Sequence, residues 1–288
     1  MYKELKKVLL KYSHHEIIFI DDGSTDKTAS IVQDIKKYDE SICLISFDSN
    51  SGKSAALNAG FEKASGDIVL TMDADLQDDP REISNLISKL NQGWDVVSGW
   101  KKKRNDPLDK TIPSKLFNYI LRKTSGLNIH DFNCGFKAYK VRVIKTLNIY
   151  GGLHRFIPYL AASNGFSVTE LPVNHRAREF GESKYGGSRM FKGFFDFLSV
   201  VFISKYSRRP LHIFGFIGFF LFLIGMIINF YLTYNWFLGE TLSNRPILFL
   251  GILLSIVGIQ FFSMGFIAEL IVSYMSKENK QSEQISEK

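Results

Sequence analysis

Residues 67–77 read DIVLTMDADLQ, an apolar run that ends directly in Asp73 and Asp75. Two carboxylates two residues apart at a strand end can share one hard cation, and the amide of Gln77 adds another oxygen. Oxygen ligands without His or Cys suit Mg²⁺ or Mn²⁺, which commonly bridge to substrate phosphates. An Asp-x-Asp sequence alone is often just a solvated turn, so the surrounding pattern decides its meaning.

The pattern of apolar strand and helix repeats on both sides of this stretch. We expect strands at 16–20, 42–47, 67–72 and 95–98, and helices through 31–35, over 53–64 and from Pro80 through Leu90. Continuous apolar strands that alternate with helices indicate an α/β fold, with a mostly parallel sheet and helices on both faces. Ligands of such sheets bind outside the carboxyl ends of the strands, where the acidic clusters of this sequence lie.

The last third of the sequence has a different composition from the rest. Residues 211–234 and 246–268 contain no Asp, Glu, Lys or Arg, and each run is long enough to cross a hydrocarbon core of about 30 Å. We therefore expect two transmembrane helices within residues 210–276. The alternative is a hairpin buried in a soluble core.

Basic residues flank this hairpin at its two outer ends. Lys205, Arg208 and Arg209 precede the first run, and Lys277 and Lys280 follow the second, while the loop at 235–245 holds one acid and one base. Positive flanks stay in the cytosol, so we expect an integral protein of the cell (inner) membrane with both termini cytoplasmic. The N-terminus shows no pattern of a cleavable signal peptide.

Thirty-six basic and 29 acidic side chains give a net charge of +7. Anionic lipid headgroups and phosphate substrates explain this excess more simply than nucleic acid does, so we expect no nucleic-acid partner. Cys43 and Cys134 lie far apart without metal-type spacing, which fits a reducing cytosol.

A juxtamembrane segment at 189–209 separates the α/β region from the apolar runs. Its polar residues recur at helical spacing between aromatic and aliphatic ones, which predicts an amphipathic helix lying in the membrane interface. A helix that faces a protein core is the alternative. The predicted organisation is a catalytic region at 1–188, this helix at 189–209, the spans at 210–276 and a polar, disordered tail at 277–288.

Two more polar clusters follow predicted strands. Asp21 and Asp22 end the first strand; they could accept hydrogen bonds from a base or ribose, or form a turn in which Ser24 or Asp26 caps the next helix. Lys53 begins a helix, whose N-terminus favours an anion. A capped helix that faces solvent is the alternative for Lys53.

A basic, glycine-containing loop lies just before the juxtamembrane helix. Within residues 175–187 it carries His175, Arg176, Arg178 and Lys184, beside Ser183. Such a loop at a membrane surface suits closure over phosphates. A polybasic stretch that only attracts anionic lipid is the alternative.

Two segments are less informative by spacing alone. Residues 131–139, which include Lys137, form an ordinary turn into a strand. Arg104 belongs to a run of four cations at 101–104, which could contact phosphate or be solvated.

Taken together these motifs resemble a known family. DDGS at 21–24, DADLQ at 73–77, NCGFKAY at 133–139, HR and GESKY within 175–185, and the two spans are similar to polyprenyl-phosphate glycosyltransferases of glycosyltransferase family 2. Dolichyl-phosphate mannose synthase and bacterial undecaprenyl-phosphate glucosyltransferases belong to this group. The resemblance covers nearly the whole chain. It implies a GT-A fold and a metal-dependent, inverting transfer from a UDP- or GDP-sugar to undecaprenyl or dolichyl phosphate at the cytoplasmic membrane face.

The resemblance also implies roles for individual residues. Asp75 and Gln77 would face the Mg²⁺ or Mn²⁺ ion, Asp73 would lie beside the donor, and Asp22 would contact the nucleotide base. Asp21 and Lys53 would complete the nucleotide-sugar site. The acceptor phosphate would meet Arg104, Lys137, Arg176, Arg178, Ser183 and Lys184, and the catalytic set would be Asp73, Asp75, Arg176, Arg178 and Lys184.

The sequence departs from this family at its start, where residues 1–7 already resemble the helix that follows the family's first strand. We therefore expect the sheet to lack an interior strand and the donor site to lack one wall. Two other functions stay open: a processive polysaccharide synthase, which normally has more spans and a Gln-x-x-Arg-Trp motif, and an inactive membrane scaffold. A homo-oligomer is compatible with all of these readings.

Overall fold

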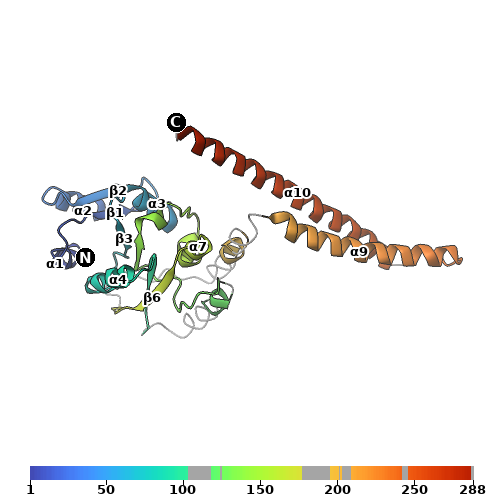
Figure 1. Cartoon of the computed structure of the whole chain (residues 1–288), viewed down its shortest axis with the longest axis horizontal. Coiled ribbons are helices and arrows are strands. Elements are labelled where there is room, and N and C mark those ends of the chain that lie inside the picture. The colour runs from blue at the N-terminus through green and yellow to red at the C-terminus, as the bar shows by residue number, and fades with distance from the viewer. Residues whose placement is uncertain are drawn as a thin grey trace. The chain divides into compact units, whose positions relative to one another are not determined.

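The computed structural model describes residues 1–102, 118–123, 125–176, 195–200, 202, 209–241 and 246–286, with side chains up to residue 274. The chain forms two compact units, residues 1–200 and residues 201–288, and each is described by itself. The first unit holds the strands and the second holds the two long helices (Figure 1).

Six strands form two sheets among the described residues of the first unit. They are β1 (Ile17–Asp21), β2 (Ile42–Ser46), β3 (Ile68–Thr71), β4 (Val96–Trp100), β5 (Lys137–Lys140) and β6 (Val168–Pro172). The first sheet pairs β1 with β2 in parallel. The second has the order β3-β5-β4-β6, in which β4 and β6 are parallel and β5 is antiparallel to both of its neighbours. The four strands expected from the sequence are confirmed to within two residues at each end.

Helices separate these strands, and those that contain residues 31–35, 53–63 and 83–90 are the ones that the hydrophobic pattern predicts. The helices are α1 (Tyr2–Leu9), α2 (Thr28–Lys36), α3 (Lys53–Lys63), α4 (Ile83–Asn91), α6 (Val141–Ile144) and α7 (Ile157–Ser163), with short 3-10 turns η1 (Pro80–Glu82) and η2 (Leu153–Phe156). Asp79 caps η1 by accepting a hydrogen bond from the N–H of Arg81, and Pro80 occupies the first turn. Proline fits there because the first N–H groups of a helix have no partner within it.

The division into two sheets falls between β1 and β3. Within the described part of the chain, β1 pairs only with β2 and β3 only with β5. The N–H of Ile17 bonds to Ser41 in the direction of β2, so the backbone polar groups of Ile18 and Ile20 point the other way. The described strands therefore form a two-stranded and a four-stranded sheet.

The hydrophobic core lies on both faces of the four-stranded sheet. Strand β5 shows this by alternation, because Tyr139 packs into a cluster with Phe132 and Phe156, whereas Ala138 packs into a second cluster with Leu86. Both clusters contain side chains with no exposed surface. The rigid platform formed in this way carries the loops at the carboxyl ends of its strands.

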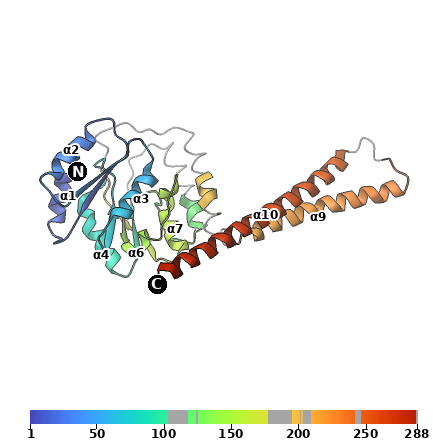
Figure 2. The same ribbon diagram turned by 90° about the horizontal axis from the view of Figure 1, so that it is seen from above.

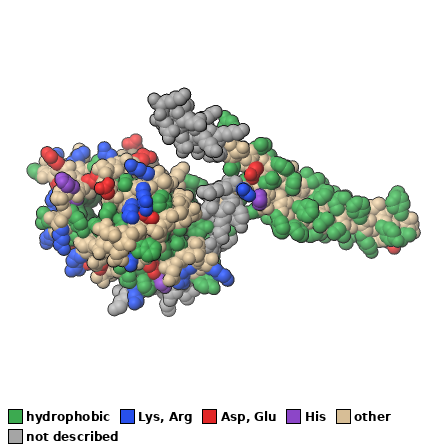
Figure 3. Space-filling model, viewed as in Figure 1, with side chains coloured by type: hydrophobic (Ala, Val, Ile, Leu, Met, Phe, Trp, Pro, Cys, Tyr) green, Lys and Arg blue, Asp and Glu red, His purple; other side chains and the backbone are tan. Residues whose placement is uncertain are grey.

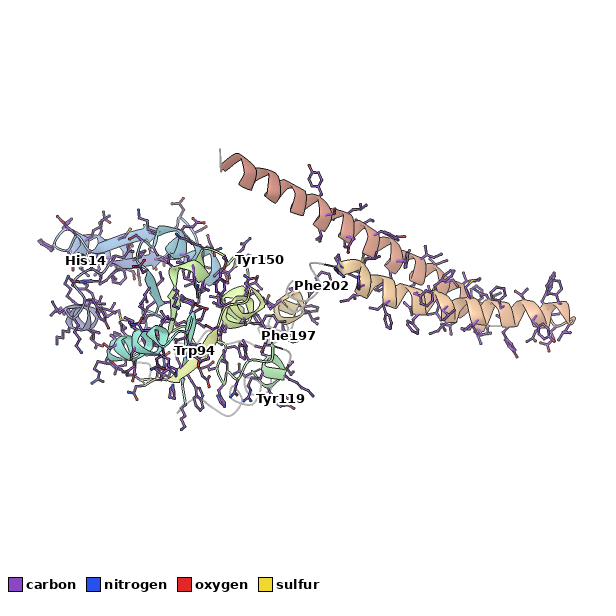
Figure 4. The ribbon with its side chains drawn as sticks, viewed as in Figure 1. His14, Trp94, Tyr119, Tyr150, Phe197 and Phe202 are labelled. Carbon is purple, nitrogen blue, oxygen red and sulfur yellow. The ribbon has the colours of Figure 1, made fainter. Side chains whose placement is uncertain are left out.

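Only part of the predicted amphipathic helix at 189–209 lies within the described residues. Residues 195–200 are helical. Phe197 packs against the cluster that contains Ile157 of α7 (Figure 4). Val200 is fully buried, whereas Phe195 is 64% exposed. The described turn therefore has one face on the catalytic core. Its contact with a membrane stays a prediction.

The second unit consists of α9 (Pro210–Phe237) and α10 (Pro246–Ser286), which lie side by side (Figure 2). Both are long and apolar enough to cross a membrane, and only 17% and 11% of their most apolar windows are buried. A hairpin in a soluble core would be mostly buried. In this protein, hydrophobic side chains cover the visible face of the α9–α10 pair, whereas charged side chains gather on the first unit (Figure 3).

Glycines allow α9 and α10 to approach closely. A Cβ atom at Gly218 would lie 2.6 Å from the carbonyl oxygen of Gly258, and one at Gly225 would lie 2.7 Å from that of Gly251. Small residues are the usual means of close packing between helices in lipid. Near the start of α9 the carboxylate of Glu269 accepts a hydrogen bond from the N–H of Leu211 at 3.2 Å.

The tail differs from the prediction, because α10 continues as far as Ser286 instead of ending before residue 277. Extending an existing helix adds one hydrogen bond for each residue that is fixed, without the cost of nucleation. Residues 277–286 are rich in Lys, Glu and Gln, which have high helix propensity. Polarity alone therefore does not end this helix.

Candidate active site

The carboxyl ends of β1, β3 and β6 meet the amino end of antiparallel β5 on one side of the first unit. Lys53 Nζ lies 2.6 Å from Asp73 Oδ1, and a Cβ on Gly135 would lie 2.6 Å from Asp73 Oδ2. Beyond β6, the N–H of Arg176 donates to the carbonyl of Gln77 at 2.8 Å. Four sequence motifs therefore lie together at this end of the sheet: those that contain Lys53, Asp73, Gly135 and Arg176.

The two aspartates that end β1 organise the loops around them. Asp21 is buried and accepts a hydrogen bond from the N–H of Ser24 at 3.1 Å. The carboxylate of Asp22 accepts from the N–H groups of Ser51, at 2.7 Å, and Gly52, at 3.0 Å. Asp22 therefore holds the start of α3. A carboxylate has about four acceptor positions, so it can take a further hydrogen bond from a ligand.

The turn after Asp22 leaves little room for a side chain. Gly23 has a positive φ of 71°, and a Cβ there would lie 2.6 Å from the backbone carbon of Ser49. This close approach requires glycine. The N-cap position of the following helix is Lys27, whose side chain makes no cap bond, while the preceding Asp26 accepts from the N–H of Thr28 at 2.9 Å.

Lys53 is the first residue of α3, as predicted, and the anion that it meets is Asp73. The Lys53 and Asp73 side chains are 40% and 39% exposed. An ion pair that is this exposed contributes little to stability, so its groups can exchange partners at low cost. Lys53 is therefore placed to contact an anion that arrives at Asp73.

The residues expected to hold a metal follow β3 in a tight turn. The N–H of Gln77 donates to Asp75 Oδ1 at 3.2 Å, and Leu76 has a φ of +64°, the one positive value among the described non-glycine residues. Strained backbone of this kind clusters at functional sites. Within the described residues no group of three His, Cys, Asp or Glu side chains converges. The carboxylate of Asp75 and the side-chain amide of Gln77 nevertheless supply oxygen ligands of the kind that Mg²⁺ or Mn²⁺ prefers.

The turn before β5 lines a small pocket together with Lys53. Lys137 is only 2% exposed, its ammonium donates to the carbonyl of Cys134, and burial lowers its pKa. Cys134 is buried too, and burial raises its pKa to about 11, so its thiol stays protonated. A buried cation at the wall of this pocket, near Asp73, is suited to meeting a negative ligand.

Arg176 makes ion pairs with the protein's own acids. Its guanidinium lies 2.8 Å from Glu4 Oε2 and 3.1 Å from Asp79 Oδ1. Hydrogen bonds from Arg81 lower the pKa of Asp79 to about 2 against the effect of burial, and the charge of Arg176 adds to this. Sequence reasoning missed Glu4, because 172 positions separate it from Arg176.

A second group that sequence reasoning missed lies beneath this edge. Asp78 is fully buried, with Lys101 Nζ at 3.1 Å and His175 Nδ1 at 3.7 Å from its Oδ1. In the described part of the chain neither Asp78 oxygen meets the geometry of a hydrogen bond. Asp78 and His175 also form an isolated antiparallel bridge, which joins the loop after β3 to the segment after β6. The only feature of the sequence that could have pointed to Asp78 is that it directly follows the acidic motif at 73–77.

The predicted residues Arg104, Arg178, Ser183 and Lys184 lie outside the described residues. Their assignment to the acceptor phosphate stays a prediction. Of the other predicted site residues, Asp22, Lys53, Asp73 and Lys137 are linked by contacts or by a shared pocket, and Gln77 is linked to Arg176.

Comparison with known proteins agrees with this architecture. The model of the family described as Glycosyl transferase family 2 matches residues 2–147. The chain is 38% identical over 273 residues to dodecaprenyl-phosphate galacturonate synthase of Rhizobium johnstonii, covering 91% of this chain and 80% of that protein. It is 34% identical over 261 residues to undecaprenyl-phosphate 4-deoxy-4-formamido-L-arabinose transferase of Salmonella paratyphi B, covering 89% and 78%.

Among solved structures, the chain is similar to glucosyl-3-phosphoglycerate synthase from Mycobacterium tuberculosis, in complex with Mn²⁺, uridine diphosphate and phosphoglyceric acid. The TM-score is 0.53 at 19% identity, with 67% of this chain and 70% of that chain covered. This likeness supports the GT-A fold. The family match and the two relatives show that the chain belongs to glycosyltransferase family 2.

Proposed function

We propose that the protein transfers a sugar from a nucleotide-sugar to a polyprenyl phosphate at the cytoplasmic face of a membrane. The names of the two relatives specify a dodecaprenyl or undecaprenyl phosphate acceptor. One observation carries the proposal to this chain: an acidic strand end with adjacent cations, in a protein whose second unit is a lipid-compatible hairpin. An enzyme with a soluble acceptor has no need of the hairpin.

The chemistry of the acceptor explains what the site provides. The second pKa of a phosphate monoester is about 6, so the acceptor is already largely dianionic in the cytosol. It needs no strong general base, unlike a sugar hydroxyl. The demands on the protein are positioning and the screening of two phosphates. A single in-line displacement would invert the anomeric centre.

On the donor side we assign the residues after β1 and β3. Asp22 and the loop that it holds would receive the nucleotide, beside Asp21, and Asp73 would lie beside the donor sugar. Asp75 and Gln77 would hold Mg²⁺ or Mn²⁺, which supplies charge neutralisation for the diphosphate leaving group. Lys53 and the buried Lys137 lie close enough to Asp73 to add positive charge there.

On the acceptor side we assign Arg176, with Arg104, Arg178, Ser183 and Lys184 as further phosphate contacts. In the structure Arg176 is already paired with Glu4 and Asp79, so its guanidinium is held at the edge before any phosphate arrives. A phosphate would replace the exposed Glu4 carboxylate. The planar fork of an arginine can then hold two phosphate oxygens at once.

Membrane orientation follows from charge. Arg209 precedes α9 together with Lys205 and Arg208, whereas Lys277 and Lys280 lie beyond the second span. The positive-inside rule puts both ends of the hairpin in the cytosol, together with the catalytic unit. Cysteine labelling of the loop at 235–245 tests this orientation, because labelling only from the cytosolic side would contradict it.

The function is tested by incubating membranes that contain the protein with labelled UDP- and GDP-sugars and undecaprenyl phosphate. We expect one donor to yield a lipid-linked sugar in the presence of Mg²⁺ or Mn²⁺, and the yield to vanish in EDTA. Full transfer in EDTA would overturn the metal-dependent site. A donor panel is needed because the two relatives are named for different sugars.

A further inference from the structure

A buried polar cluster lies behind the first turn of α3 and has no place in the function proposed so far. Ser54, the second residue of α3, is 1% exposed. Its hydroxyl lies 2.8 Å from the carbonyl of Gly151 and 3.1 Å from His154 Nδ1, and it accepts from the N–H of His154 at 3.2 Å. One hydroxyl thus joins two segments about a hundred residues apart.

The three contacts match the capacity of a hydroxyl, which has one proton and two lone pairs. The Ser54 proton goes to the carbonyl of Gly151, and the N–H of His154 occupies one lone pair. The other lone pair then accepts from Nδ1–H of the neutral imidazole, which fixes the tautomer. In this arrangement the Ser54 hydroxyl uses its proton and both lone pairs, so it holds the first turn of α3 against residues 151–154.

The surroundings keep the His154 ring neutral. Burial lowers its pKa to about 3, and the positive charges of Lys53, Arg155 and Lys137 act in the same direction. A neutral ring adds no further positive charge beside Lys53. The cluster can therefore hold the backbone of α3 without repelling the side chain that α3 presents to the site.

The cluster connects to the site through the chain itself. Lys53 immediately precedes Ser54, and its ammonium lies 2.6 Å from Asp73. On the other side of this turn, Asp22 holds the N–H groups of Ser51 and Gly52. A small shift of the first turn of α3 would therefore break the contact between Lys53 and Asp73.

We propose that Ser54 and His154 are positioning residues, which fix the first turn of α3 so that Lys53 is presented at Asp73, on the donor side of the site. This inference rests on the proposed function, since it needs the donor to bind there. Ser54 is buried behind the helix, whereas His154 also lines the small pocket beside Lys53. Their effect is transmitted through Lys53.

A double-mutant cycle separates this role from ordinary core stability. Ser54→Ala and His154→Leu should each lower kcat/KM for the nucleotide-sugar about tenfold, the effect of one or two lost hydrogen bonds, mainly through KM. In a Lys53→Met background the same changes should have no further effect on transfer. His154→Asn, whose amide can replace Nδ1–H, should recover most of the lost KM. Thr146→Val is the matched control, because it removes a hydroxyl bonded to a backbone carbonyl away from the site.

The positioning role would be overturned if Ser54→Ala and His154→Leu lowered kcat/KM by the same factor in the presence and absence of Lys53. It would also be overturned if kcat of these variants fell in parallel with their melting temperatures. The folded fraction of each variant is measured by thermal unfolding, so a variant that only misfolds is recognised. Failure of the inference is distinct from failure of the proposed function. If Lys53→Met is as active as the wild type while Asp75→Ala is inactive, the transferase stands and the role of Ser54 and His154 falls.

Discussion

The two ends of the catalytic sheet contain similar charged residues in very different states. At the end where β4 and β6 begin, the buried Asp95 accepts from the N–H and hydroxyl of Ser167 at 3.0 and 2.9 Å, is bonded by Arg142, and has Lys140 at 3.4 Å. Every oxygen of this carboxylate has a partner inside the protein.

At the opposite end the charges are only partly satisfied. Asp73 shares a half-exposed ion pair with Lys53, and Arg176 is held by the exposed Glu4 as well as by the buried Asp79. Exposed ion pairs contribute little to stability, so we expect the end at Asp95, the closed end, to maintain the fold and the opposite, open end to be available to a ligand.

Removing a carboxylate from the open end should abolish chemistry and leave the fold intact. Asp75→Ala should reduce sugar transfer at least about a thousandfold, or roughly 4 kcal/mol, because a metal ligand is lost. The melting temperature should change little, since this strand-end turn contributes little packing. Transfer is measured with labelled nucleotide-sugar in membranes, and wild-type turnover in this variant would refute the metal site.

Removing the carboxylate of Asp95, at the closed end, should lower stability and leave the chemistry intact. Asp95→Asn should cost about 2–3 kcal/mol of unfolding free energy, because it weakens a buried group with several partners. Turnover per folded molecule should be unchanged. Denaturant unfolding measures the first effect, and transfer normalised to folded protein measures the second.

Lowering the pH should remove the stabilisation that the ionised Asp95 provides in the wild type. Burial opposes a lower pKa of Asp95, but the bonds from Arg142 and Ser167 outweigh it and the pKa is lowered. A lowered pKa stabilises the fold above the unfolded-state value of about 4, and that stabilisation is lost as the pH falls through the folded-state value. The difference in stability between wild type and Asp95→Asn should therefore be constant near neutrality and shrink below about pH 4. A difference that grows in acid would contradict this assignment.

The acceptor side should be sensitive to shape as well as to charge. Arg176→Lys keeps the charge but loses the planar fork, and we expect a ten- to hundredfold loss in rate, or roughly 1.4–2.7 kcal/mol. Membrane association should survive, because α9 and α10 anchor the chain. A residue that only attracts anionic lipid would tolerate the change, so unchanged turnover would contradict the phosphate contact.

The smallest effect concerns the partner of Arg176. Glu4→Gln should free the guanidinium from one competing carboxylate and lower KM for the polyprenyl phosphate about two- to threefold, or roughly 0.5 kcal/mol. Asp34→Asn, which removes an exposed ion pair with Lys37 on α2, is the control and should change nothing. A rise in KM with Glu4→Gln would mean that Glu4 orients Arg176 and does not compete for it.

The sequence was sufficient for what depends on neighbouring residues. Apolar runs and turn residues located β1 to β4, and the acidic motifs follow β1 and β3 as the sequence pattern predicts. Contacts between distant residues could not be predicted, because Ser54 and His154, or Glu4 and Arg176, share no local pattern. The helical continuation of α10 to Ser286 was not predicted either.

The central claim is that the open end of the sheet transfers sugar to a lipid phosphate. The most direct measurement incubates the membrane-embedded protein with undecaprenyl phosphate and each nucleotide-sugar, then determines the mass and anomeric configuration of the lipid product. We predict one sugar joined to the lipid through a single phosphate, with its configuration inverted relative to the donor. Folded protein that forms no lipid-linked sugar from any donor, or a product with retained configuration, would contradict this account.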